Sequence, residues 1–202
     1  NVAVGLNALD VNTTGLCNVA VGSRTLDANT TGCYNTAVGE AALGSNTTAN
    51  NNTAIGLCAM KNNTTGLQNT AVGVGALDSN TTASYNVSIG QASMEDNTTG
   101  AKNTAVGTDA LANNTTGCCN VALGLGAMFN NTTANDNVAI GVCALKDQVD
   151  GGINNVAIGK ASMTKNTTGD NNTAVGKESL NKNTTGYNSV AVGSLALCSH
   201  TT

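Results

Sequence analysis

The tripeptide Asn-Thr-Thr occurs ten times in this chain and is the most frequent candidate for chemical modification. Each copy fits the Asn-x-Thr acceptor pattern for N-linked glycans, which are attached on surface loops of secreted proteins. The candidate acceptors are Asn12, Asn29, Asn46, Asn63, Asn80, Asn97, Asn114, Asn131, Asn166 and Asn183. Threonine-rich turns could also take O-linked glycans. The alternative is that Asn-Thr-Thr-Gly is good turn chemistry and stays unmodified.

The seven cysteines are a second set of candidates. None of them forms a Cys-x-x-Cys pair and His200 is the only histidine, so the clustered ligands of a zinc site are missing. Cys17 and Cys33 fall at the last two positions of neighbouring 17-residue repeats, and stacking of the repeats would bring them within disulfide reach. Cys118 and Cys119 could bridge to another chain. The alternative is that the cysteines are small apolar residues at tolerant positions.

Residues that could support catalysis do not come together in the sequence. The carboxylates fall at variable positions of the repeat and form no phased pair. The glycines at 73–75 and 124–126 lack the third glycine and the helix of a nucleotide-binding loop. Residues 150–152 show only a fragment of the calcium-binding repeat Gly-Gly-x-Gly-x-Asp. We therefore predict no enzyme activity, no cofactor and no metal site.

The chain repeats every 17 residues. The units begin at Asn1, Asn18, Asn35, Asn52, Asn69, Asn86, Asn103, Asn120, Asn137, Asn155, Asn172 and Ser189, and the ninth unit has 18 residues. Position 5 is always Gly, position 9 is always Leu or Met, and positions 6, 7, 10, 11, 16 and 17 vary. Such periodicity is typical of solenoids. We treat residues 1–202 as a single tandem-repeat array and expect it to be a segment of a longer chain.

The repeat unit predicts an all-β fold. Positions 1 to 5, Asn-[Val/Thr]-Ala-[Val/Ile/Leu]-Gly, indicate a short strand whose side chains alternate between two faces. Leu or Met at position 9, with Val or Ile of the strand, is expected to fill the interior, and Asn-Thr-Thr-Gly is expected to form the return turn. The predicted fold is a parallel β-solenoid (β-roll or β-helix) of about twelve coils, stacked roughly 4.8 Å apart. An Asn ladder at position 1 would link the side-chain amides of successive coils.

The core of such a coil is thin. Each buried Leu, Met or Val contributes about 1.5–3 kcal/mol, whereas ordering costs about 1.5 kcal/mol per residue. Stacked backbone hydrogen bonds, side-chain ladders or a partner must therefore supply the remaining stability. The small Ala at position 3 suits close packing against another subunit, which favours a homotrimer about the long axis. The alternative is a single-chain solenoid whose Ala row lies under its own turn.

Composition limits the classes of partner. The net charge is −4 and the eight basic residues are scattered, so the Lys/Arg patch of a nucleic-acid-binding protein is missing. The apolar runs are only a few residues long, so we predict no membrane span. Self-association, as a homotrimer or an end-to-end filament, and covalent glycans are the partners that the sequence favours.

The motif Asn-[Thr/Ser/Val]-[Ala/Val]-[Val/Ile]-Gly, followed by Ala-Leu or Ala-Met and Asn-Thr-Thr-Gly, resembles known fibre repeats. It is similar to repeats of bacteriophage tail fibres and to the Asn-Ser-Val-Ala-Ile-Gly repeat of trimeric autotransporter adhesin heads. Residues 188–193 read Asn-Ser-Val-Ala-Val-Gly, which is nearly that motif. The resemblance covers the whole chain. It implies a parallel β-roll or β-solenoid, often trimeric, that serves as a stalk or adhesive head outside the cell.

These observations predict a structural protein of an extracellular fibre or filament, coated with sugar if the acceptors are used. The main alternative is the shaft or head of a phage-type tail fibre or surface adhesin that binds a receptor. Both functions place the chain outside the cell or on the surface of a virion or cell. A minor alternative is an ice-binding solenoid. Adjacent Thr residues of an extended segment point in opposite directions, so each coil offers a single Thr column to ice.

Overall fold

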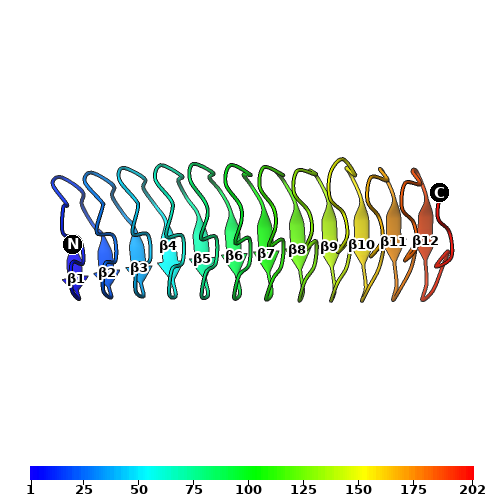
Figure 1. The fold of residues 1–202 in the computed structure, drawn as a ribbon, viewed down its shortest axis with the longest axis horizontal. Coiled ribbons are helices and arrows are strands. Elements are labelled where there is room, and N and C mark those ends of the chain that lie inside the picture. The colour runs from blue at the N-terminus through cyan, green and yellow to red at the C-terminus, as the bar shows by residue number, and fades with distance from the viewer.

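The computed structural model describes residues 1–202 as a straight stack of coils with one three-residue strand in each coil (Figure 1). The strands are β1 (Val2–Val4), β2 (Val19–Val21), β3 (Thr36–Val38), β4 (Thr53–Ile55), β5 (Thr70–Val72), β6 (Val87–Ile89), β7 (Thr104–Val106), β8 (Val121–Leu123), β9 (Val138–Ile140), β10 (Val156–Ile158), β11 (Thr173–Val175) and β12 (Val190–Val192). We number each coil after its strand and each position from the first residue of its unit. The structure contains no helix.

The strands form one parallel sheet in sequence order, which confirms the predicted β-solenoid. Equivalent residues pair throughout, as in Ala20 with Ala37. The extra residue of coil 9 does not change the strand register, as the pairing of Ala139 with Ala157 shows. The additional residue is therefore absorbed in the turn, and the sheet itself stays regular.

The interior holds one large side chain from each coil. Leu or Met at position 9 is fully buried in coils 2 to 11, with Ala of position 3 and a small residue of position 8 beside it. The strand Val and Ile residues were expected inside with the Leu and Met, and this prediction is wrong. They lie on the outside, because a 17-residue coil is so narrow that the position 9 side chain leaves room for little more than a methyl group across from it.

The invariant glycine of position 5 is required by the stacking. Gly107 has a φ of +136°, a conformation that L side chains rarely adopt. A Cβ built on Gly107 would lie 2.7 Å from the carbonyl carbon and oxygen of Gly124 in the next coil. The glycines thus lie in one axial file, with the backbone of each coil pressed against the next.

Candidate functional site

The Asn of Asn-Thr-Thr is a structural residue inside the coil. In Asn63, Nδ2 donates to Oδ1 of Asn46 at 3.1 Å and to the carbonyl oxygen of Gly66 at 3.1 Å. Its Oδ1 accepts a hydrogen bond from Nδ2 of Asn80 at 2.7 Å. These two amide-to-amide bonds repeat along most of the stack, and Asn63 is fully buried. We call this file of position 12 side chains the Asn ladder.

The Asn ladder argues against N-linked glycans at the predicted acceptors. In most of them, as in Asn63, both Nδ2 hydrogens are used, and the amides of nine of the ten predicted acceptors are fully buried, so little space remains for a sugar. The exception, Asn12 in the first coil, is half-buried; its Nδ2 donates only to the carbonyl oxygen of Gly15, and its Oδ1 accepts from Asn29. The buried acceptors are Asn29, Asn46, Asn63, Asn80, Asn97, Asn114, Asn131, Asn166 and Asn183. A glycan attached to one of these nine side chains before folding would have to occupy the interior of the coil.

Position 1 forms a different link from the one predicted. Oδ1 of Asn52 accepts from the backbone N–H of Asn69 in the next coil at 2.9 Å. Its Nδ2 donates to the carbonyl oxygen of Gly66 at 2.8 Å, the same oxygen that Asn63 contacts. The expected continuous amide-to-amide ladder therefore lies at position 12, and position 1 mainly ties side chain to backbone.

The two Thr residues of the turn differ in what their hydroxyl groups do. Oγ1 of Thr64, at position 13, donates to the carbonyl oxygen of Thr81 in the next coil at 3.0 Å. The same bond recurs along the stack. Thr65, at position 14, is exposed and its hydroxyl makes no hydrogen bond within the chain. Position 13 therefore joins coils, and position 14 presents a free hydroxyl to solvent.

The predicted disulfide is not formed, since Cys17 and Cys33 are both free thiols. Sγ of Cys33 accepts from the backbone N–H of Leu16 at 3.3 Å and donates to the carbonyl oxygen of Thr31 at 3.4 Å. Cys17 is exposed and has a φ of +59°. The two thiols occupy adjacent positions of neighbouring coils, but Cys33 is directed at its own turn. Cys118 and Cys119 are also free.

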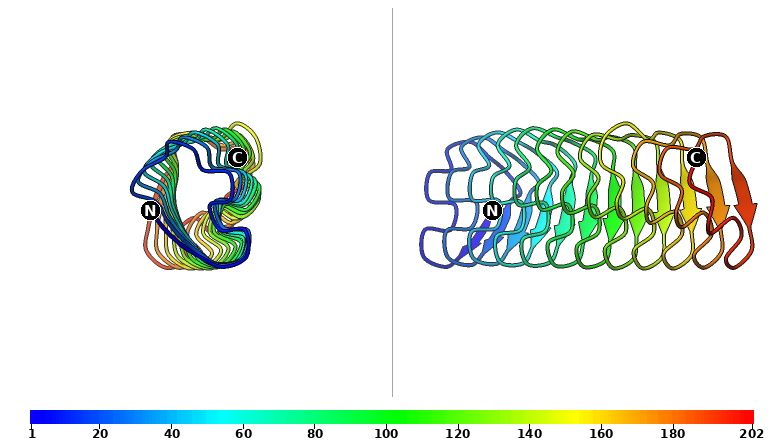
Figure 2. Two further views of the ribbon diagram at one scale, coloured as in Figure 1. Left: turned by 90° about the vertical axis from the view of Figure 1, so that its left-hand side faces the viewer. Right: turned by 45° about the vertical axis from the view of Figure 1, so that its right-hand side comes forward.

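The coil outline is indented on one side (Figure 2). Side chains of positions 7 and 10 line two shallow cavities, and we call this row of positions the groove side of the rod, or the groove. The first cavity, of about 400 Å³, lies in coils 2 to 4, where Arg24 and Glu40 form an ion pair at 2.8 Å. A second cavity of about 260 Å³ lies in coils 7 to 9 beside Phe129. Each cavity is lined by a Cys–Lys pair three residues apart, Cys58 with Lys61 and Cys143 with Lys146.

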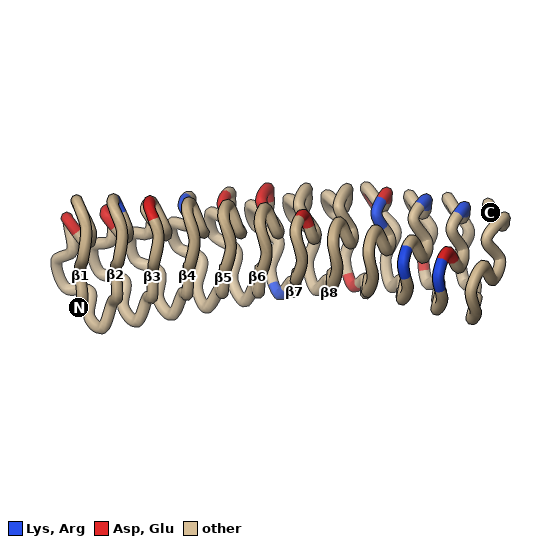
Figure 3. The backbone as a smooth tube through the Cα atoms, turned by 90° about the horizontal axis from the view of Figure 1, so that it is seen from below, with Lys and Arg blue, Asp and Glu red and all other residues tan.

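Charge along this side of the rod is unevenly distributed. Acidic residues dominate the groove edge of the first seven coils, whereas most lysines lie in the last four (Figure 3). No three His, Cys, Asp or Glu side chains come close enough to hold a metal ion. This side of the rod therefore carries mainly acidic residues towards one end and mainly lysines towards the other.

Asp78 is the groove residue whose environment is least favourable to charge. Burial raises the pKa of this carboxyl, and the nearby Lys61 ammonium lowers it by a smaller amount. One carboxyl oxygen of Asp78 is buried without a hydrogen-bond partner. Burial, followed by the charges of Asp96, Asp78 and Asp109, also raises the pKa of Glu95. The surroundings of Asp78 therefore favour its protonated form.

We expect Asp78→Asn to stabilise the protein slightly at pH 7. A raised pKa means that the folded state binds the proton more tightly, so stability falls as pH rises from the unfolded-state value of 3.8 through the folded-state value. The amide removes that loss and should raise the melting temperature by about 2 °C or less at pH 7, with no gain below pH 3.8. Asp27→Asn, at the same position of coil 2, is the control. An equal gain in both variants would contradict the role of burial.

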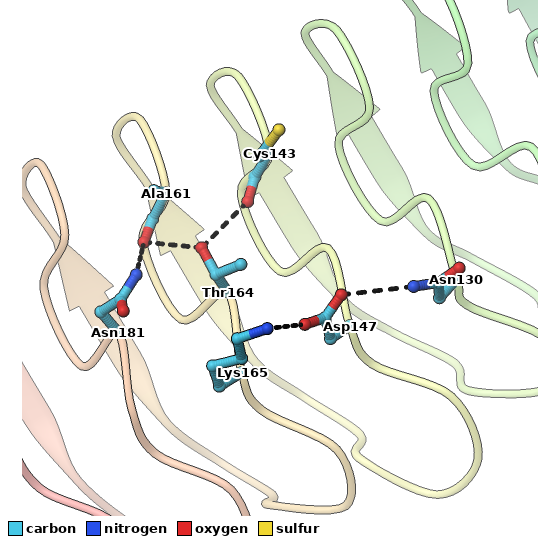
Figure 4. A network of polar contacts seen from close by, with 7 residues as sticks. All are labelled: Asn130, Cys143, Asp147, Ala161, Thr164, Lys165 and Asn181. Atoms are coloured by element: carbon cyan, nitrogen blue, oxygen red, sulfur yellow. Dashed lines mark hydrogen bonds and ion pairs between the residues drawn. The ribbon is translucent and has the colours of Figure 1, made fainter.

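Coil 9 interrupts the regular ladders. Gln148 replaces the Asn of position 12, and its Nε2 donates to the carbonyl oxygen of Gly152. Oε1 of Gln148 and Oδ1 of Asn131 are left buried without partners. On the surface Asp147 spans the break, since it accepts from Nδ2 of Asn130 at 3.3 Å and pairs with Nζ of Lys165 at 2.6 Å (Figure 4).

An apolar surface runs along the outer face, which consists of the first and third residues of every strand from β1 to β12. These positions hold only Val, Thr, Ile and Leu and carry no charge. Ile55 and Ile89 are 40 % and 39 % exposed although both lie in the middle of the sheet. Exposed apolar patches of this length usually mark an interaction surface.

Comparison with protein-family models, curated proteins and solved structures finds no match. The structure has no helix of the length and apolar character that would be needed to cross a bilayer.

Proposed function

We propose that this chain is the shaft of an extracellular fibre, or of a fibre on the surface of a virion or cell. The outer face is the observation that supports the proposal, because it runs uncovered along the whole rod. The side-chain ladders also support the proposal, because each coil repeats the same axial hydrogen bonds. Further coils can therefore be stacked on the rod with the same contacts. The resemblance to tail-fibre and adhesin repeats points to the same class of proteins.

The outer face fits a second copy of the same chain. Two uncharged sheet faces can pack together without burying an unpaired ion. Twelve coils at about 4.8 Å give a strip roughly 50 Å long, and its area of about 500 Å² is less than the roughly 800 Å² per partner of a standard interface. Self-association of this segment should therefore be modest, and it should strengthen as coils are added.

A receptor-binding shaft or head is the second candidate function. The adhesin-like motif at residues 188–193 favours it, and the varied side chains of the groove could contribute to recognition. Electron microscopy of the native material separates the two functions. A continuous filament supports a structural fibre, whereas a finite shaft that ends in a knob supports a receptor-binding fibre.

The outer face can be tested by adding charge to it. We expect the double substitution Ile55→Lys with Ile89→Lys to abolish concentration-dependent self-association, because two lysines would be buried between the faces. Sedimentation velocity over a wide concentration range measures the change, expected to be tenfold or more in the association constant. Leu57→Lys with Leu125→Lys adds the same charges at exposed apolar side chains outside the outer face, and it should leave association unchanged. A wild-type chain that stays monomeric would argue against the self-associating shaft.

A further inference from the structure

Position 14 is the one exposed position of the coil that does not vary. Eleven of the twelve units have Thr there, and coil 9 replaces it with its enlarged turn. All of these Thr side chains are exposed. The members are Thr14, Thr31, Thr48, Thr65, Thr82, Thr99, Thr116, Thr133, Thr168, Thr185 and Thr202. The varied residues at positions 6, 10, 11, 16 and 17 show that exposed positions have otherwise diverged between units.

The other uniform positions of the unit have a structural explanation. Gly of position 5 allows the close approach of coils, Leu or Met of position 9 fills the interior, and Asn of position 12 forms the Asn ladder. Thr of position 13 donates its hydroxyl to the next coil, as Thr64 does at 3.0 Å. At position 14 only Thr133 makes a hydroxyl bond within the chain, to Asp150 of the irregular coil 9 at 3.1 Å. Folding therefore does not explain a uniform Thr at position 14.

We propose that the Thr hydroxyl groups of position 14 are the sites of O-linked glycosylation, and that they form a sugar column along the rod. The inference rests on the proposed function as an extracellular fibre. Oγ1 of each Thr would attack the anomeric carbon of a sugar held on a phosphate donor. A new carbon–oxygen bond forms to Thr, the bond from the sugar to the phosphate oxygen breaks, and the hydroxyl proton passes to a base of the transferase.

Two features favour a covalent sugar over ordered ice. The hydroxyls at position 14 form a single file, because those at position 13 are already used between coils. One file matches an ice lattice in one direction only, whereas a glycan needs just an accessible hydroxyl. The buried amides of the Asn ladder argue against the competing N-linked acceptors of the same turn.

Intact-mass measurement of the native protein, followed by fragmentation that retains glycans, tests the proposal. We expect sugar increments on position 14 threonines and none on Thr64 or Asn63. A native mass equal to that of the bare chain would overturn the inference, as would sugars confined to other positions. Electron microscopy of the same sample separates the two proposals, since bare fibres would contradict the sugar column alone and the absence of fibres would contradict the proposed function.

A pair of substitutions tests the structural argument on the unmodified chain. Thr65→Ala should leave the melting temperature unchanged, because its hydroxyl has no partner. Thr64→Ala should lower it measurably, because that hydroxyl links two coils at 3.0 Å. In the glycosylating host, Thr65→Ala should lose one sugar increment and Thr64→Ala should lose none. Equal destabilisation by the two substitutions would show that position 14 is uniform for folding, and the proposal would fail.

Discussion

Gly107→Ala is expected to lower the free energy of unfolding by about 4 kcal/mol, combining the backbone strain with the overlap of the new side chain. The φ of +136° is essentially restricted to glycine, and the added Cβ would lie 2.7 Å from the carbonyl carbon and oxygen of Gly124. Neither group can move without separating coils 7 and 8. Chemical denaturation followed by circular dichroism measures the loss, and hydrogen exchange should locate it at the junction of these coils.

The matched control is Gly126→Ala in the groove. Gly126 has a φ of +59°, and an added Cβ would meet nothing closer than Sγ of Cys143 at 3.8 Å. Ala41, Ala92 and Ala161 occupy the equivalent position with similar φ values of +57°, +52° and +56°. The change should therefore alter stability by less than about 1 kcal/mol. Similar stabilities of the two variants would refute the claim that glycine at position 5 is needed for stacking.

The period of the sequence was sufficient to predict the fold, because every residue of a stacked coil lies over its counterpart in the next coil. The glycine file and the parallel sheet follow directly from the 17-residue spacing. Coil 9 keeps this register because its extra residue is absorbed in the turn around Gln148.

The side of the strand that faces inward could not be predicted from alternation alone. Alternation separates Ala20 from Val19 and Val21, and hydrophobicity then favours burial of the valines. The structure buries Ala20 instead, since Leu26 already fills the narrow interior. The width of the coil decides which face of the strand is buried. That width depends on the turns, where residues such as Leu26, with a φ of +51°, adopt a left-handed conformation that the sequence does not signal.

The Asn of Asn-Thr-Thr was misinterpreted because the glycan acceptor pattern and the buried ladder use the same residues. A signal was present in the repeat itself. Positions 10 and 11 vary freely just before the Asn, whereas the Asn is retained in every regular turn before the twelfth unit. A residue that is retained beside variable positions is typically one with several hydrogen bonds to make, as Asn63 has with Asn46, Gly66 and Asn80.

A substitution in the Asn ladder is the second change for which we expect a large loss of stability. We expect Asn63→Asp to cost about 3 kcal/mol at pH 7, because the carboxylate oxygen that replaces Nδ2 would face two acceptors, Oδ1 of Asn46 and the carbonyl oxygen of Gly66. The other oxygen keeps one donor, Nδ2 of Asn80. Burial against the two acceptors raises the folded-state pKa of the new carboxyl above its unfolded value, so the penalty should shrink as pH falls through the folded-state value. Asn62→Asp changes the exposed neighbour and should have little effect at either pH. Urea unfolding at pH 7 and pH 4 measures both variants, and a pH-independent or equal loss in the two would contradict a buried, donating ladder.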